Sequence, residues 1–270
     1  MEYVEKPLLI ASDVDGTLLD VTETITARTK DVLDRVVASG TPFLLVSGRP
    51  PRWIRPIAEM ADVNGLSVCA NGAVLYDIGK DTVVSAETLD PALSRNIADT
   101  VKELLPGSVV AVERHPHNGI DETFVCEPDY ASPWGDTKIP VRSLAEAVGQ
   151  PAVKILIRHR NMTSDEMART VVPVLRDHAT ITYSTNQGLL EFSKKDVTKA
   201  TGLAKAAEMF GIGRADIVAF GDMPNDIPML EWAGHGVAMS NAHPDALAVA
   251  DEVTAANSED GVAQVLERWF

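Results

Sequence analysis

The amino-acid sequence predicts an α/β protein in which a doubly wound parallel sheet is interrupted by a second, inserted α+β domain. Three observations lead to this prediction. Short apolar runs rich in β-branched residues alternate with amphipathic helical patterns at both ends of the 270-residue chain. Such continuous apolar runs are typical of parallel strands that helices cover on both faces. Between the two ends, the pattern changes to a hairpin signal followed by strands, helices and longer loops.

The first part of the chain reads as strand, loop, helix and strand. Pro7–Ser12 is a short apolar run, and apolar residues then recur at helical spacing from Ile25 until Gly40. Phe43–Val46 is predicted to be the next buried strand. The same alternation returns at the far end, where we expect a strand, a short helix, a second strand and a closing helix over Asp216–Phe220, Asn225–Ala233, His235–Met239 and Ser258–Trp269.

The middle of the chain has a different character. Asn71-Gly72 lies between two short apolar runs, which predicts a hairpin. Beyond it we expect a mixture of helices and strands, at Leu93–Leu104, Val109–Val112, Thr123–Cys126, Val153–Ile157, Ser164–Arg176 and Thr180–Tyr183. We therefore assign residues 1–83 and 188–270 to a discontinuous core, and residues 84–187 to an inserted α+β domain.

Composition and charge exclude several classes of function. The net charge of -15 argues against a nucleic-acid partner, because nucleic acids are bound by basic surfaces. No uninterrupted apolar stretch approaches the ~20 residues that a membrane-spanning helix needs. Cys69 and Cys126 lie too far apart in sequence to indicate a zinc knuckle or a disulfide framework. We expect a cytoplasmic protein with no membrane partner.

The strongest chemical signal is a pair of acids directly after the first predicted strand. Asp13 and Asp15 would leave the carboxyl edge of a sheet, where open α/β folds bind ligands. Such a pair suits phosphoryl transfer: one carboxylate attacks phosphorus, while the other protonates the leaving oxygen and then deprotonates water. Two like charges also call for a hard divalent cation such as Mg²⁺. A simple turn at a strand end would explain one acid, but not both.

A second acidic cluster, Asp222 to Asp226, follows another predicted strand and precedes a helix. If the two strands are neighbours, Asp222 and Asp13 can bind one ion. Helix capping would account for Asn225 or Asp226, because Asn and Asp satisfy the free amides at a helix start. Capping does not explain Asp222.

Two weaker signals indicate groups that could hold a phosphate. Ser47-Gly48-Arg49 comes after the strand Phe43–Val46, and offers a hydroxyl and backbone amides, although a Ser-Gly pair is usually only a turn. Lys199 lies at the start of the helix predicted over Thr198–Phe210. A lysine there is usually a surface charge, but it opposes the helix macrodipole, so its position favours a nearby anion.

Taken together and in this order, Asp13-Val14-Asp15-Gly16-Thr17, Ser47-Gly48-Arg49, Lys199 and Gly221-Asp222-Met223-Pro224-Asn225-Asp226 resemble the four motifs of the haloacid dehalogenase superfamily of phosphatases. The resemblance spans the whole chain. The insert between the second and third motifs, with Asn71-Gly72 before it, and Gly236-Val237-Ala238-Met239 with Asn241-Ala242 after it, resembles the Cof-type subfamily with a type IIB cap.

The resemblance implies a Rossmannoid core and a role for each motif residue. By it, Asp13 is the nucleophile and Asp15 the general acid and base. The phosphate would be held by Ser47, Gly48, Lys199 and Asn225. Mg²⁺ would be bound by Asp13, the backbone carbonyl of Asp15, and Asp222, with Asp226 orienting the metal's waters. Met223-Pro224 departs from the family, which usually has glycine or small residues there.

The predicted function is hydrolysis of a small phosphomonoester, such as a sugar phosphate, through an aspartyl phosphate. A phosphomutase or phosphotransferase that uses the same intermediate, and a phosphate-binding module without turnover, remain alternatives. Specificity in this family is attributed to the cap. Its polar residues that could reach a substrate, or equally be surface groups, are Arg114, His115, Arg158, His159, Arg160 and Asn186. The sequence does not indicate an oligomeric state.

Overall fold

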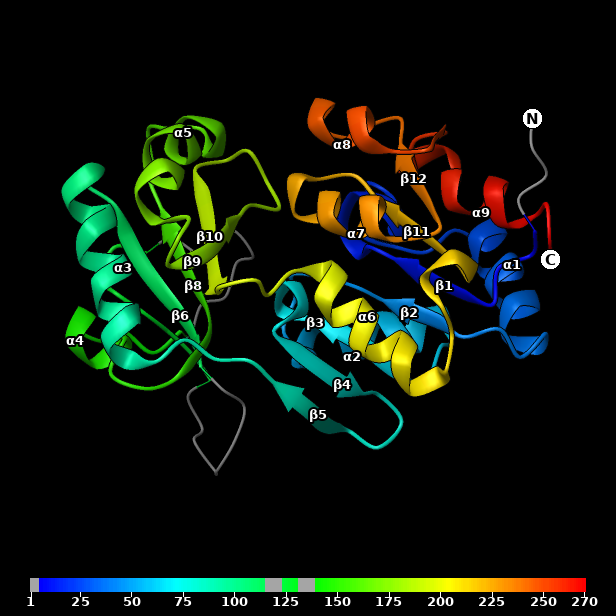
Figure 1. The fold of residues 1–270 in the computed structure, drawn as a ribbon, viewed down its shortest axis with the longest axis horizontal. Coiled ribbons are helices and arrows are strands. Elements are labelled where there is room, and N and C mark those ends of the chain that lie inside the picture. The colour runs from blue at the N-terminus through cyan, green and yellow to red at the C-terminus, as the bar shows by residue number, and fades with distance from the viewer. Residues whose placement is uncertain (1–4, 115–122, 131–138) are drawn as a thin grey trace. The chain divides into compact units, whose positions relative to one another are not determined.

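The computed structural model describes residues 5–114, 123–130 and 139–270 (Figure 1). The chain divides into two compact units. Met1–Ser85 and Thr198–Phe270 form the first, and Ala86–Val197 form the second. The first unit is therefore discontinuous in sequence, and the second is inserted between its two halves.

The first unit contains a five-stranded parallel sheet among its described residues. Each neighbouring pair of strands runs in the same direction. The strand order across the sheet is β13 (Glu252–Thr254), β12 (His235–Met239), β11 (Ile217–Gly221), β1 (Leu9–Ser12) and β2 (Phe43–Leu45). The parallel α/β class predicted from the sequence is confirmed.

Helices cover the sheet because its central strands are apolar on both faces. Leu9 and Ile217 belong to one buried cluster with Leu203 of α6 and Met229 of α7. Ile10 and Phe220, which alternate with them along the strands and so face the other side, are also buried. The helices of this unit are α1 (Ala27–Ala38), α2 (Pro51–Ala61), α6 (Lys199–Phe210), α7 (Ile227–Trp232), α8 (Pro244–Val249) and α9 (Gly261–Leu266).

The predicted hairpin forms a small sheet of its own with β3 (Leu66–Cys69), β4 (Val74–Asp77) and β5 (Thr82–Ala86). The turn between β3 and β4 holds Asn71 at φ 56° and Gly72 at φ 99°. A Cβ on Gly72 would lie 1.9 Å from the carbonyl oxygen of Thr198. Only glycine fits this contact, which places the hairpin against the start of α6.

The second unit is an antiparallel sheet with helices, as expected for an α+β domain. Its strand order is β7 (Phe124–Cys126), β6 (Val109–Arg114), β8 (Ala152–Arg158), β10 (Leu189–Lys194) and β9 (Ala179–Thr182), and its helices are α3 (Pro91–Leu104), α4 (Leu144–Ala147) and α5 (Ser164–Leu175). The proposed insert boundary at residue 187 falls before β10. Because β10 pairs with β8 and β9, this unit continues to Val197.

Some local expectations differ from the structure. The helix expected over Asn225–Ala233 begins as a 3-10 turn, Pro224–Asp226, before α7. The closing helix starts at Gly261 rather than Ser258, because Asp260 has a left-handed conformation, with φ 59°, between a 3-10 turn and α9. The short elements α8 and β13 have too few residues to show a periodic pattern. No helix in the described part of the chain is long and apolar enough to cross a membrane.

Candidate active site

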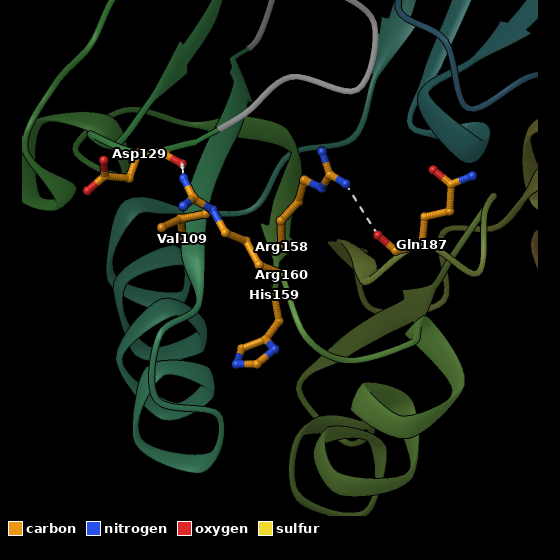
Figure 2. Close-up of a pocket in the computed structure, with 6 residues that line it drawn as sticks. All are labelled: Val109, Asp129, Arg158, His159, Arg160 and Gln187. Carbon is orange, nitrogen blue, oxygen red and sulfur yellow. Dashed lines mark hydrogen bonds between the residues drawn. The ribbon is translucent and has the colours of Figure 1, made fainter.

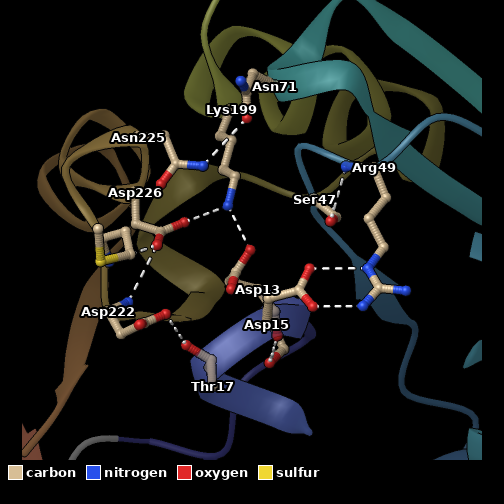
Figure 3. Close-up of polar contacts among 12 residues, drawn as sticks. Asp13, Asp15, Thr17, Ser47, Arg49, Asn71, Lys199, Asp222, Asn225 and Asp226 are labelled. Atoms are coloured by element: carbon tan, nitrogen blue, oxygen red, sulfur yellow. Dashed lines mark hydrogen bonds and ion pairs between the residues drawn. The ribbon is translucent and has the colours of Figure 1, made fainter. Parts of the chain in front are cut away.

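The carboxyl ends of β1 and β11 bring the predicted acids together. These strands are parallel neighbours, with Ser12 opposite Phe220, so Asp13 and Asp222 leave the same edge of the sheet. The backbone N–H of Asp13 donates to the carbonyl oxygen of Phe220 at 2.9 Å. Carboxylate oxygens of Asp13, Asp222 and Asp226 all lie within 4.8 Å of one another, and all three residues are buried (Figure 3).

Lys199 is the first residue of α6, and it is buried, with a relative exposure of 1%. Its Nζ lies 2.5 Å from Oδ1 of Asp13 and 2.5 Å from Oδ1 of Asp226. Burial alone would lower the pKa of Lys199, but these two carboxylates outweigh it and raise the pKa above its ordinary value. The anion that the sequence led us to expect near this lysine is thus a pair of protein carboxylates.

The acids themselves are held in an unfavourable environment for negative charge. Burial, together with the nearby carboxylates, raises the pKa of Asp13 well above its usual value, although Lys199 opposes the shift. Burial and the neighbouring Asp226 raise the pKa of Asp222 to about 7, despite a hydrogen bond from the Thr17 hydroxyl. Three carboxylates therefore face one ammonium. This donor set of hard oxygen atoms with excess negative charge fits Mg²⁺.

This electrostatic imbalance predicts a pH-dependent stability of the metal-free protein. Burial raises the pKa of Asp222 to about 7 in the folded protein, whereas an aspartate in the unfolded chain titrates near pH ~4. Between these two pKa values, Asp222 keeps its proton in the folded protein but has released it in the unfolded chain. Unfolding then releases the proton, so the free energy of unfolding falls as pH rises, by about 4 kcal/mol over this range. Urea unfolding in EDTA at several pH values measures this change.

Asp222→Asn is the matched variant, because an amide does not titrate in this range. We expect a smaller decrease of stability with pH in this variant. We also expect Mg²⁺ to stabilise the wild type at neutral pH, since a ligand that binds only the folded state raises its stability. An equal pH dependence in both proteins would show that Asp222 is not the titrating group.

Asp15 is not one of the three clustered acids, and its side chain is 48% exposed. Arg49 binds it with both arms of its guanidinium group: Nε donates to Oδ2 at 2.8 Å, and Nη2 donates to Oδ1 at 2.5 Å. In Figure 3 the carboxylate of Asp13 points to Lys199, whereas that of Asp15 points to Arg49. The sequence placed Arg49 only within a phosphate-binding turn. The signal that could have suggested the pair is its position after β2, the strand beside β1.

The loop that carries Asp15 is fixed by close contacts. Gly16 has φ 79°, and a Cβ there would lie 2.4 Å from Oδ2 of Asp222. The side chain of Asn241 donates from Nδ2 to the carbonyl oxygen of Gly16 at 2.9 Å. Glycine is favoured at this position of the first motif because the backbone is left-handed, and a side chain here would also meet the carboxylate of Asp222.

Ser47 and Gly48 form a tight loop that contacts Asn71 of the hairpin. The backbone N–H of Asn71 donates to the carbonyl oxygen of Ser47 at 3.0 Å. A Cβ on Gly48 would lie 3.0 Å from Oδ1 of Asn71, and the same oxygen accepts from Nδ2 of Asn225 at 3.1 Å. In the described part of the chain, the buried Oδ1 of Asn225 has no hydrogen-bond partner. The sequence identified Asn71 as a turn residue, but not as a contact of Asn225.

Asp226 is completely buried and connects Lys199 to the loop of Asp222. Its Oδ2 accepts hydrogen bonds from the backbone N–H groups of Asp222 at 3.1 Å and Met223 at 3.0 Å, while Oδ1 binds Lys199. Pro224 begins the 3-10 turn, a position where a missing N–H costs little. The unusual Met223-Pro224 pair is therefore compatible with this loop geometry.

The candidate residues of the second unit fall into two groups. Arg114 is buried and donates from Nη2 to the carbonyl oxygen of Glu146 at 2.7 Å. Asn186 uses both ends of its amide on Asp165: Oδ1 accepts from the backbone N–H at 3.0 Å, and Nδ2 donates to Oδ2 at 2.9 Å. Both side chains therefore have structural partners. His115 lies outside the described residues.

The other three candidates line a pocket of about 150 Å³, together with Val109, Asp129 and Gln187 (Figure 2). The guanidinium of Arg158 donates to the carbonyl oxygen of Gln187 at 3.3 Å, and that of Arg160 donates to the carbonyl oxygen of Asp129 at 3.1 Å. Figure 2 shows His159 pointing away from both arginines. Both arginines that line the pocket are held by backbone carbonyl oxygens. They are better candidates than His159 for a contact with an anionic group.

A family model described as haloacid dehalogenase-like hydrolase matches residues 10–266. The chain belongs to this family. The match includes both halves of the first unit and all four motifs. The family and the enzyme class, a haloacid dehalogenase phosphatase, agree with the prediction from the sequence.

Relatives of this haloacid dehalogenase-like hydrolase act on different phosphorylated metabolites. The 5-amino-6-(5-phospho-D-ribitylamino)uracil phosphatase YitU of Bacillus subtilis is 31% identical over 281 residues, covering 98% of each chain. Pyridoxal phosphate phosphatase YbhA of Escherichia coli is 28% identical, covering 96% of this chain and 97% of the relative. The haloacid dehalogenase subclass IIB sugar phosphatase BT4131 has a TM-score of 0.83 at 25% identity, covering 97% of this chain and 98% of that one.

Proposed function

We propose that this protein is a Mg²⁺-dependent phosphomonoester hydrolase that acts on a small phosphorylated metabolite through an aspartyl phosphate on Asp13. The observation that carries the proposal is the buried cluster in which Asp13 contacts Lys199 beside Asp222 and Asp226. A carboxylate held at a sheet edge, next to a buried cation and further acids, suits nucleophilic attack on a phosphate ester.

In the proposed reaction, Oδ of Asp13 forms a bond to phosphorus as the bond from phosphorus to the leaving oxygen breaks. Asp15 gives its proton to that oxygen. Water then attacks the aspartyl phosphate and gives a proton to Asp15, and the bond between Asp13 and phosphorus breaks. Phosphate is released, and both acids return to their starting state.

The remaining groups of the site would bind the phosphate and Mg²⁺ and keep each other in position. Lys199, the Ser47 hydroxyl, the Gly48 amide and the Asn225 side chain are proposed to hold the phosphate oxygens. Mg²⁺ would be held by Asp13, the backbone carbonyl of Asp15, and Asp222, where it would supply positive charge that offsets the phosphate and the carboxylates. Asp226 would keep Lys199 and the loop of Asp222 in position.

The substrate proposed is a small phosphomonoester such as a sugar phosphate. Two relatives are named for phosphorylated metabolites, and a similar structure is named as a sugar phosphatase, which supports a substrate of this size. The second unit is proposed to act as the cap that selects the substrate. Its candidate contacts are Arg158 and Arg160, which line the pocket described above.

The proposal is tested by incubating the protein with p-nitrophenyl phosphate and a panel of phosphorylated metabolites in Mg²⁺, then in EDTA. We expect phosphate release that EDTA abolishes and added Mg²⁺ restores. If no substrate gives chelator-sensitive release, the alternative of a binding module without turnover is favoured.

Hydrolysis and phosphoryl transfer differ in the molecule that accepts the phosphoryl group, which is water in the first and a sugar hydroxyl in the second. When the reaction is run in ¹⁸O-labelled water, hydrolysis places the label in the released phosphate. A phosphomutase or phosphotransferase instead moves the phosphoryl group to a sugar hydroxyl without the label. The second result would contradict the proposed reaction while leaving the proposed intermediate intact.

A further inference from the structure

Arg49 holds the carboxylate of Asp15 in a two-point contact at the edge of the active site. Both donor-to-acceptor distances, 2.8 Å and 2.5 Å, are those of charge-assisted hydrogen bonds. Within the described residues no other group hydrogen-bonds to this carboxylate. With 48% of the Asp15 side chain exposed, its orientation depends on the guanidinium group more than on packing.

Arg49 is itself anchored at both sides of its backbone. Its N–H donates to the Ser47 hydroxyl at 3.0 Å, and its carbonyl oxygen accepts from the N–H of Ala70 at 2.9 Å. Pro50 and Pro51, at the start of α2, restrict the chain that follows. The side chain is only 21% exposed, so the guanidinium projects from a rigid loop. A planar group fixed in this way sets both the position and the plane of its partner carboxylate.

We propose that Arg49 is a positioning residue that fixes the Asp15 side chain for its proton transfers. When Asp15 is protonated, one oxygen keeps its hydrogen bond from the guanidinium while the other carries the proton to the leaving oxygen, and the ionised carboxylate then regains the two-point contact. The inference rests on the proposed function of Asp15. Proton transfer requires a group within hydrogen-bond reach of the reacting oxygen, and a loosely held side chain spends most of its time elsewhere. Arg49 therefore acts through Asp15, and does not need to contact the substrate.

The experiment measures the first chemical step, with enzyme in excess over ester, by following release of the leaving alcohol. Two esters are compared: phenyl phosphate, whose leaving oxygen needs a proton, and p-nitrophenyl phosphate, whose leaving group departs as a stable anion. We expect Arg49→Ala to slow the step roughly 10-fold to 100-fold with phenyl phosphate, but less than about 3-fold with p-nitrophenyl phosphate.

Three other outcomes would overturn the proposal. Equal losses with both esters would mean a general structural role. A raised KM with an unchanged rate at saturation would mean that Arg49 binds the substrate. Full activity in Arg49→Lys would mean that charge alone suffices, because an ammonium group cannot reproduce the two-point contact.

A double-mutant cycle tests whether the effect passes through Asp15. In an Asp15→Asn background, Arg49→Ala should cause less than about a 2-fold further loss with phenyl phosphate. The same loss in both backgrounds would show that Arg49 acts independently, and would overturn the proposal. Arg55→Ala is the matched control, in the helix α2 that follows this loop. Its guanidinium binds the surface acids Glu59 and Asp81, so the variant should leave both rates unchanged.

Failure of this inference is distinguishable from failure of the proposed function. If wild-type protein releases phosphate in Mg²⁺ and Asp13→Asn does not, the hydrolase proposal stands whatever Arg49 does. If wild-type protein releases no alcohol from either ester, the hydrolase proposal itself is wrong.

Discussion

Replacement of Asp13 by Asn is expected to lower turnover by at least about 10⁴-fold, because an amide cannot form the aspartyl phosphate. The fold should persist, since Lys199 keeps Asp226 as a partner and the buried site loses a negative charge. Steady-state phosphate release with p-nitrophenyl phosphate and the thermal unfolding midpoint measure the two effects separately.

Asp34→Asn is the matched control for this variant. Asp34 lies on the surface of α1 and pairs with Lys30, so the same chemical change there should leave turnover unchanged. Turnover of Asp13→Asn at the wild-type rate would remove Asp13 from its proposed role. If Asp13→Asn loses cooperative unfolding as well as turnover, the loss of turnover does not identify the nucleophile. Asp13→Ser is then measured in its place.

Replacement of Lys199 by Ala is expected to lower both stability and activity. It leaves Asp13 and Asp226 buried without their common partner, and removing one member of a buried ion pair costs about 3–5 kcal/mol. It also removes a proposed phosphate ligand, so kcat/KM should fall roughly 10²-fold to 10³-fold. Urea unfolding in EDTA measures the first effect, and initial rates in Mg²⁺ measure the second.

Lys205→Ala serves as the control, because Lys205 is an exposed residue of the same helix. We expect Mg²⁺ to restore part of the stability lost in Lys199→Ala, since the cation replaces positive charge among the carboxylates. An unchanged kcat/KM with lowered stability would assign Lys199 a purely structural role. Unchanged stability would contradict the account of the buried cluster.

The centre of the site was predictable because backbone topology determines it. Asp13 and Asp222 each follow a buried apolar strand, and parallel neighbours must end at the same edge of the sheet. Lys199 was marked by an unfavourable charge at a helix start. These signals depend on strand ends and helix ends, which sequence patterns locate well.

The contacts of Arg49, Asn71 and Asp226 were not predictable, because they depend on the direction of side chains in loops. Arg49 and Asp15 are separated by 34 positions in sequence, and nothing in their spacing indicates a two-point contact. Likewise, the proposed end of the insert preceded β10. The apolar residues of β10 would suit a buried strand of either unit. It belongs to the second unit because it pairs with β8 and β9.

Asp13 is proposed to carry the phosphoryl group during the reaction. Asp15→Asn should slow hydrolysis of the intermediate, so this variant is mixed with p-nitrophenyl phosphate in Mg²⁺, quenched in acid and digested for peptide mass analysis. We expect a phosphoryl adduct on Asp13, which is absent when EDTA is present. Release of p-nitrophenol with the phosphoryl group on another residue, or on none, would contradict it.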